Sequence, residues 1–107
     1  IGGYMSQSMK VLTVPELPAG SMKTVTALSK RITIANVGGQ YFAVDDMCTH
    51  AQCSLGSEGF IDGNVVTCGC HGAQFDMTSG KVMALPATTD LEVYEVTVEG
   101  DALMVHI

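Results

Sequence analysis

Four cysteines and two histidines are concentrated in two short stretches of this chain. The first is Cys48-Thr49-His50-Ala51-Gln52-Cys53 and the second is Cys68-Gly69-Cys70-His71-Gly72. Each contains one Cys–His pair at a spacing typical of metal ligands, Cys48-x-His50 and Cys68-x-x-His71, and seventeen residues separate His50 from Cys68. Thiolate and imidazole together suit zinc or an iron–sulfur centre. The sequence therefore predicts a metal centre shared by the two stretches.

Both stretches follow predicted β-strands, so a rigid sheet would present them side by side at one end of a domain. β-Branched runs alternate with turn signals along the whole chain, and no long helical periodicity, repeat or low-complexity segment interrupts them. The predicted strands are Lys10–Val14, Met22–Leu28, Arg31–Asn36, Tyr41–Asp45, Asn64–Cys68, Gln74–Asp76, Leu91–Val98 and Ala102–Ile107. This pattern predicts an all-β fold, a small antiparallel β-sandwich or barrel.

Three segments are typical of hairpin turns, because Gly and Asn adopt positive φ at little cost. They are Asn36-Val37-Gly38-Gly39, Asp62-Gly63-Asn64 and Glu99-Gly100-Asp101. The segment Pro15–Gly20 is expected to be a loop or a single helical turn.

The composition is that of a folded domain: 107 residues, 47% hydrophobic and 15% charged, with a net charge of −6. We expect one domain over residues 1–107, with residues 1–4 left over from cloning ahead of a natural start at Met5. No stretch approaches the ~20 apolar residues of a membrane helix, and no signal peptide is recognisable, so we expect a cytoplasmic protein without a membrane anchor.

Charge is unevenly distributed along the sequence. Residues 1–31 carry four basic residues and one acid, whereas residues 32–107 carry Lys81 and ten acids. This acidic balance argues against nucleic acid as a partner and favours a protein with a basic docking face. Five of the carboxylates, Asp45, Asp46, Glu58, Asp62 and Asp76, are expected to be solvated charges that steer such a partner.

The two Cys–His pairs distinguish between metal centres. Structural zinc sites usually pair Cys with Cys and His with His, whereas each stretch here is mixed. From about Arg31 to the C-terminus the chain resembles the Rieske family, whose signature is C-x-H, a gap of this size, and C-x-x-H. The resemblance implies a Rieske-like fold with a two-loop cluster-binding subdomain at about residues 46–86. It also implies one 2Fe–2S cluster, with Cys48 and Cys68 on one iron and His50 and His71 on the other.

The resemblance extends to Cys53 and Cys70, which stand where respiratory, quinol-oxidising Rieske proteins carry a disulfide between the two loops. It implies a Cys53–Cys70 disulfide, with two buried free thiols as the alternative. Ferredoxins of aromatic-ring dioxygenases generally lack this pair, and a disulfide is unusual in a mesophilic cytosol.

Three further positions bear on the reduction potential. High-potential family members place Ser and Tyr where Ala73 and Phe75 stand here, and their hydroxyls donate hydrogen bonds to sulfur. Ala and Phe lack that donor, which predicts a potential in the lower part of the Rieske range. Pro86 lies in a segment that resembles the proline-containing loop shielding the cluster.

The resemblance implies a soluble, monomeric Rieske-type ferredoxin, a one-electron carrier between a flavin-containing reductase and an oxygenase, with no catalysis of its own. One alternative is a cluster domain related to quinol-oxidising respiratory proteins, which the cysteine pair favours. Two others are a structural zinc-binding interaction module and a dithiol oxidoreductase using Cys53 and Cys70.

Overall fold

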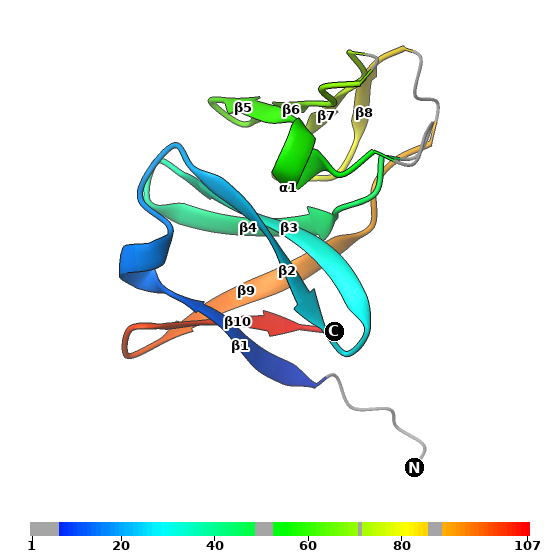
Figure 1. Ribbon diagram of the computed structural model, residues 1–107. Coiled ribbons are helices and arrows are strands. Elements are labelled where there is room, and N and C mark those ends of the chain that lie inside the picture. Colours follow the sequence, from blue (N-terminus) through cyan, green and yellow to red (C-terminus); the bar gives the residue numbers. More distant parts are fainter. Residues whose placement is uncertain (1–6, 49–52, 71, 86–88) are drawn as a thin grey trace.

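The computed structural model describes residues 7–48, 53–70, 72–85 and 89–107. His50, His71, Pro86 and residues 1–4 lie outside the described residues. The described part is built from two antiparallel sheets, one inserted into the connection between two strands of the other (Figure 1). No helix in the described ranges is long and apolar enough to cross a membrane.

Six strands form the larger sheet, in the order β1-β10-β9-β4-β3-β2. Their bounds are β1 Ser8–Thr13, β2 Met22–Ala27, β3 Lys30–Val37, β4 Gln40–Asp45, β9 Val93–Glu99 and β10 Ala102–His106. A 3-10 turn, η1 (Val14–Glu16), follows β1. The sheet curls until β1 and β2 approach each other, which gives a nearly closed barrel (Figure 1).

Four short strands form the second sheet, in the order β5-β6-β7-β8. They are β5 Phe60–Asp62, β6 Val65–Thr67, β7 Gln74–Asp76 and β8 Val82–Ala84, and a single helical turn, α1 (Leu55–Glu58), precedes them. This small sheet lies against one end of the barrel, with α1 next to β2 and β3 (Figure 1). The predicted all-β fold is confirmed.

Two hydrophobic cores result from this arrangement. Ile32 and Ile34 of β3 face the interior of the barrel, together with Leu103 and Val105 of β10. Ala35, on the opposite face of β3, packs towards the small sheet. Successive side chains of a strand point to opposite faces. Since each face of β3 packs against one of the two cores, residues 32–36 are all buried and show no alternation of buried and exposed positions.

All eight predicted strands are present, with ends that shift by up to two residues. The three predicted hairpin turns are also confirmed; between β3 and β4, for example, Gly38 and Gly39 have φ of 62° and 95°. The predictions missed β5, β8 and α1. Each has only three or four residues, too short for a periodic pattern to appear.

Candidate metal centre

Cys48 and Cys68 occupy equivalent positions at the start of two loops. The backbone N–H of Cys48 donates to the carbonyl of Cys53 at 3.0 Å, and that of Cys68 donates to the carbonyl of Ala73 at 2.8 Å. In each loop a backbone hydrogen bond thus joins two residues that are five apart in sequence, and we call this closed base of the loop its neck. Both cysteine side chains are almost fully buried, with 3% and 1% exposure. The first loop leaves the end of β4, and the second connects β6 to β7.

A disulfide between Cys53 and Cys70 joins the two loops, with the Cα atoms 6.5 Å apart, and Cys48 and Cys68 take no part in it. The predicted cross-link is therefore present. Cys53 is buried and Cys70 is exposed. The sulfur of Cys68 lies within 4.8 Å of both disulfide sulfurs, so the cross-link brings the two loops together directly beside one predicted ligand.

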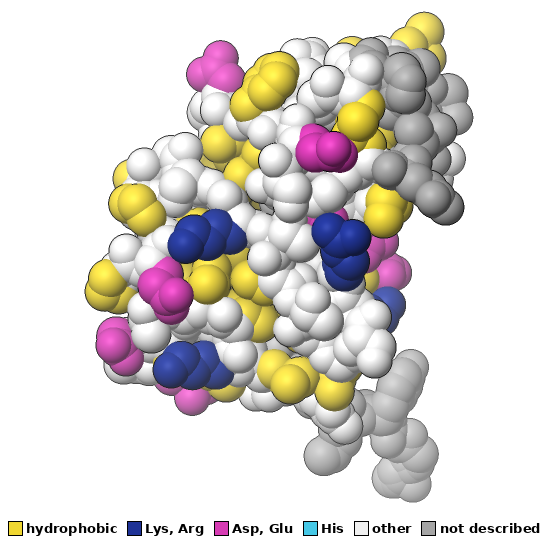
Figure 2. All heavy atoms as spheres, viewed as in Figure 1, with side chains coloured by type: hydrophobic (Ala, Val, Ile, Leu, Met, Phe, Trp, Pro, Cys, Tyr) yellow, Lys and Arg dark blue, Asp and Glu magenta, His cyan; other side chains and the backbone are white. Residues whose placement is uncertain are grey.

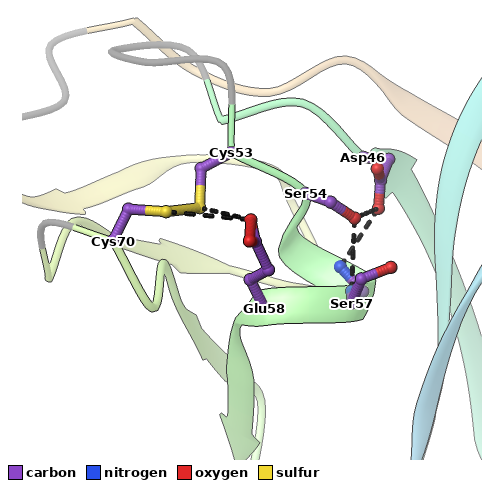
Figure 3. Close-up of a disulfide and its surroundings, with 7 residues drawn as sticks. Asp46, Cys53, Ser54, Ser57, Glu58 and Cys70 are labelled. Carbon is purple, nitrogen blue, oxygen red and sulfur yellow. Dashed lines mark hydrogen bonds between the residues drawn. A yellow bond between two sulfur atoms is a disulfide. The ribbon is translucent and has the colours of Figure 1, made fainter.

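The side chain of Glu58 extends from α1 to the disulfide (Figure 3). Its Oε2 lies 3.4 Å from the sulfur of Cys53 and 3.9 Å from that of Cys70. A disulfide sulfur carries no hydrogen, so these are contacts of a carboxylate with oxidised sulfur, and only the reduced thiols would donate to Glu58.

Two glycines permit α1 to sit close to both of its supports. A Cβ at Gly56 would overlap the side chain of Thr24 on β2, and a Cβ at Gly69 in the second loop would overlap the carbonyl oxygen of Glu58. In the described structure α1 is therefore held between the barrel and the second loop at distances that only glycine allows.

Asp46 corrects one expectation from the sequence. It was predicted to be a solvated charge, but its side chain is completely buried at the end of β4. Burial alone would raise the pKa of this carboxyl, but hydrogen bonds from Thr24, Ser54, Thr33 and the Gly56 N–H outweigh it, and the pKa is lowered.

Two other predicted surface carboxylates also have specific partners. Asp45 accepts a hydrogen bond of 2.7 Å from the hydroxyl of Tyr94. Burial and the neighbouring charge of Asp45 raise the pKa of that hydroxyl. Asp76 accepts from the backbone and side chain of Thr78, which lowers the pKa of its carboxyl. Asp62 and Glu58 are exposed.

Ala73 and Phe75 are completely buried beneath the second loop. Phe75 pairs with Val66 across β6 and β7, and the carbonyl of Ala73 closes the loop neck as described above. Neither side chain carries a hydrogen-bond donor. Both therefore supply an apolar floor to the second loop.

Cys48 and Cys68 are buried in the same hydrophobic cluster, each at a loop neck, and thiolate sulfur is a soft donor that suits iron or zinc. The other two predicted ligands, His50 and His71, lie outside the described residues. The sulfur of Cys68 lies beside the disulfide sulfurs, in a group of described residues that does not include Cys48. The residues present fit half of the ligand set predicted for a 2Fe–2S cluster.

Comparison with known proteins identifies the family. The model of the Rieske [2Fe-2S] domain matches residues 7–95. The chain is 38% identical over 96 residues to the biphenyl dioxygenase ferredoxin subunit of a Pseudomonas species (strain KKS102), covering 90% of this chain and 88% of that protein.

Two solved structures add to the comparison. The structure of a complex of reduced oxygenase and oxidised ferredoxin in carbazole 1,9a-dioxygenase matches with a TM-score of 0.86 and 33% identity, over 92% of this chain and 91% of that chain. The cyanobacterial plasma membrane Rieske protein PetC3 of Synechocystis PCC 6803 matches with a TM-score of 0.72 and 31% identity, over 91% and 97%.

Proposed function

Because the chain belongs to the Rieske [2Fe-2S] domain family, we propose that it is a ferredoxin that passes single electrons from a flavin-containing reductase to an oxygenase. The carrying observation is the pair of buried cysteines at the two adjacent loop necks. Similarity to a dioxygenase ferredoxin subunit over nine-tenths of the chain supports the ferredoxin role.

In this proposal Cys48 and Cys68 ligate one iron of a 2Fe–2S cluster, and His50 and His71 ligate the other. When bound, such a cluster supplies a centre that accepts and releases one electron. The chain's own contribution is to hold the two thiols at fixed loop necks and to exclude water from them. Their exposure of 3% and 1% is consistent with that task.

The apolar floor of the second loop sets the expected reduction potential. Hydrogen bonds to cluster or ligand sulfur stabilise the reduced, more negative state. Ala73 and Phe75 supply no donor at full burial. We therefore propose a midpoint potential in the lower part of the Rieske range of about −150 to +300 mV.

Charge on the two sheets favours a basic partner at the cluster-binding end. Residues 47–91, which span both loops and the small sheet, contain Glu58, Asp62, Asp76 and Asp90 but only one basic residue, Lys81. In Figure 2, Lys and Arg side chains lie over the barrel and none is visible over the small sheet. An acidic end of this kind would attract a reductase or oxygenase with a basic docking face.

The disulfide favours one alternative function, that of a cluster domain in quinol oxidation. The likeness to PetC3, a plasma membrane Rieske protein, shows that the structural match extends beyond ferredoxins of dioxygenases. The apolar side chains of Ala73 and Phe75 argue against the alternative function, because quinol oxidation works with a high-potential cluster.

Redox titration of the purified protein at several pH values, followed by EPR and visible CD, tests the proposal. A ferredoxin is expected to show a low midpoint that falls with pH only under alkaline conditions, where a ligand imidazole loses its proton on oxidation. A midpoint in the upper part of the Rieske range would favour quinol oxidation. Zinc on metal analysis, without a cluster signal, would instead favour a structural zinc module and contradict both.

A further inference from the structure

Asp46 is the point where the first loop is attached to the barrel. One carboxylate oxygen, Oδ1, accepts hydrogen bonds from two threonine hydroxyls of the barrel, one serine hydroxyl and one backbone N–H. The donors are Thr24 on β2 at 2.7 Å, Thr33 on β3 at 2.8 Å, Ser54 at 2.9 Å and Gly56 at 3.0 Å. A single oxygen thus joins two strands of the barrel to the segment that follows the loop (Figure 3 shows Asp46 and Ser54).

The second carboxylate oxygen carries the ion pair. Oδ2 lies 3.3 Å from Nη2 of Arg31, whose side chain is half exposed, while Asp46 itself is fully buried. In the described structure Oδ2 accepts no hydrogen bond. Burying a carboxylate costs free energy unless the group is hydrogen-bonded or paired with a cation. The four donors to Oδ1 and the guanidinium beside Oδ2 supply both kinds of partner, so this contact is specific.

The backbone around Asp46 closes the loop at the same place. The carbonyl of Asp46 accepts from the Leu55 N–H at 2.8 Å, and the Cys48 N–H donates to Cys53. Met47 and Ser54 form an isolated antiparallel bridge between these two hydrogen bonds. Asp46 precedes Cys48 by two residues, and no flexible spacer lies between the carboxylate and the predicted ligand.

We propose that Asp46 is a positioning residue: its hydrogen bonds to β2 and β3 fix the neck of the first loop and thereby the place of the Cys48 thiol relative to that of Cys68. This inference rests on the proposed function, because it assigns Asp46 to the assembly of that site. The residue touches no cluster atom in the proposal and acts through the loop neck.

The test changes the donors, which lie far from the ligands in sequence, as well as the acceptor. Thr33→Val removes one buried donor with little change of shape, Thr24→Val removes a second, and D46N replaces the charged acceptor. Thr26→Val is the matched control, since Thr26 is exposed on the same strand as Thr24. Hydrogen bonds to a charged acceptor are about twice as strong as those between neutral groups, so each lost donor should have a measurable effect.

The holoprotein is measured in each variant by EPR, by visible CD and by the rate of iron transfer to a chelator. T33V and T24V are each expected to accelerate iron transfer about tenfold or more and to shift the EPR g-values of the intact protein, while T26V behaves as the wild type. D46N is expected to have a larger effect. A merely structural role would lower the melting temperature of the variants and leave the EPR and CD spectra of the intact holoprotein unchanged.

Wild-type spectra and iron-transfer rates in T33V and T24V would overturn the proposal. The two threonine variants keep the test decisive where D46N fails to fold. If the wild type itself gave no 2Fe–2S signal after reconstitution with iron and sulfide, the proposed function would fail. Unchanged variants beside a wild type with a normal signal would overturn only the role of Asp46.

Discussion

Removing the Cys53–Cys70 cross-link should destabilise the protein more without its cluster than with it. The two cysteines are 17 residues apart in sequence. The chain-entropy model gives about 3 kcal/mol at 25 °C for closing a loop of this length in the unfolded chain. In the apoprotein nothing else joins the two loops covalently, so the full amount is expected.

With the cluster bound, Cys48 and Cys68 already close nearly the same segment of chain in the proposed ligand set. The entropy of that closure is then counted once, and the disulfide restricts only the short remaining pieces. Since closure entropy rises only logarithmically with loop length, the additional stabilisation in the holoprotein is expected to be about 1 kcal/mol or less.

The assay is urea unfolding of the apoprotein and thermal bleaching of the holoprotein, each for the oxidised protein, the reduced protein and the double variant C53A/C70S. Reduced wild type is the control for packing, because it keeps the sulfur of the buried Cys53 that the alanine removes. Equal destabilisation of the apoprotein and holoprotein, or a loss below about 1 kcal/mol in the apoprotein, would refute the reasoning.

Four further predictions concern single features of the structure. Leu28 and Ser29 form the β2–β3 turn at φ of 49° and 68° without a glycine. Replacing them by Asn-Gly should raise the melting temperature by about 4–8 °C, because these residues adopt positive φ at little cost. A lower melting temperature would show that the turn is not strained. Gly69→Ala should lower the melting temperature by a similar or larger amount, because the new Cβ meets a carbonyl of α1; an unchanged value would show that α1 can move. The raised pKa of Tyr94 means that the folded state holds the phenolic proton more tightly than the unfolded state. The resulting stability is present below pH about 10 and is lost as the pH rises further. In Tyr94→Phe, the free energy of unfolding should therefore fall less steeply with pH above about 10. Ala73→Ser should raise the midpoint potential by adding a donor near sulfur, as redox titration would show; the wild-type alanine, which differs from serine by the hydroxyl alone, is the reference.

The strands could be predicted from the sequence because their signals are local. The β9–β10 hairpin, for example, shows β-branched residues on both sides of Glu99-Gly100-Asp101, and the turn forms there. β5 and β8 could not be predicted, because three residues carry no period and their pairing depends on neighbours distant in the chain. The Leu28-Ser29 turn contains none of the Gly, Asn and Asp residues that usually mark a two-residue hairpin turn with positive φ.

Cys48 and Cys68 were predicted as ligands from their types and spacing, and the structure buries both at loop necks. The Cys53–Cys70 pairing was implied by the family resemblance and is present. Asp46 was missed for a physical reason. Its partners Thr24, Thr33 and Ser54 lie 22, 13 and 8 residues away, and an aspartate at the end of a strand is ordinarily exposed. Glu58 was missed likewise, because its contact with the disulfide depends on α1, which has no sequence signal.

The two loop necks rest on different supports, and this explains why contacts between the loops matter. The first neck is fixed to the barrel through Asp46, whereas the second continues the β6–β7 ladder of the small sheet. Outside the loops, the small sheet is tied to the segment that leads into β9 by two hydrogen bonds, from the Leu91 N–H to the carbonyl of Gly80 and from the Val82 N–H to the carboxylate of Asp90. A shift of one sheet against the other would therefore change the separation of Cys48 and Cys68 directly. The disulfide and the close approach of Gly69 to α1 oppose that shift where the loops meet, so the geometry of the site depends less on the apolar contact between the sheets.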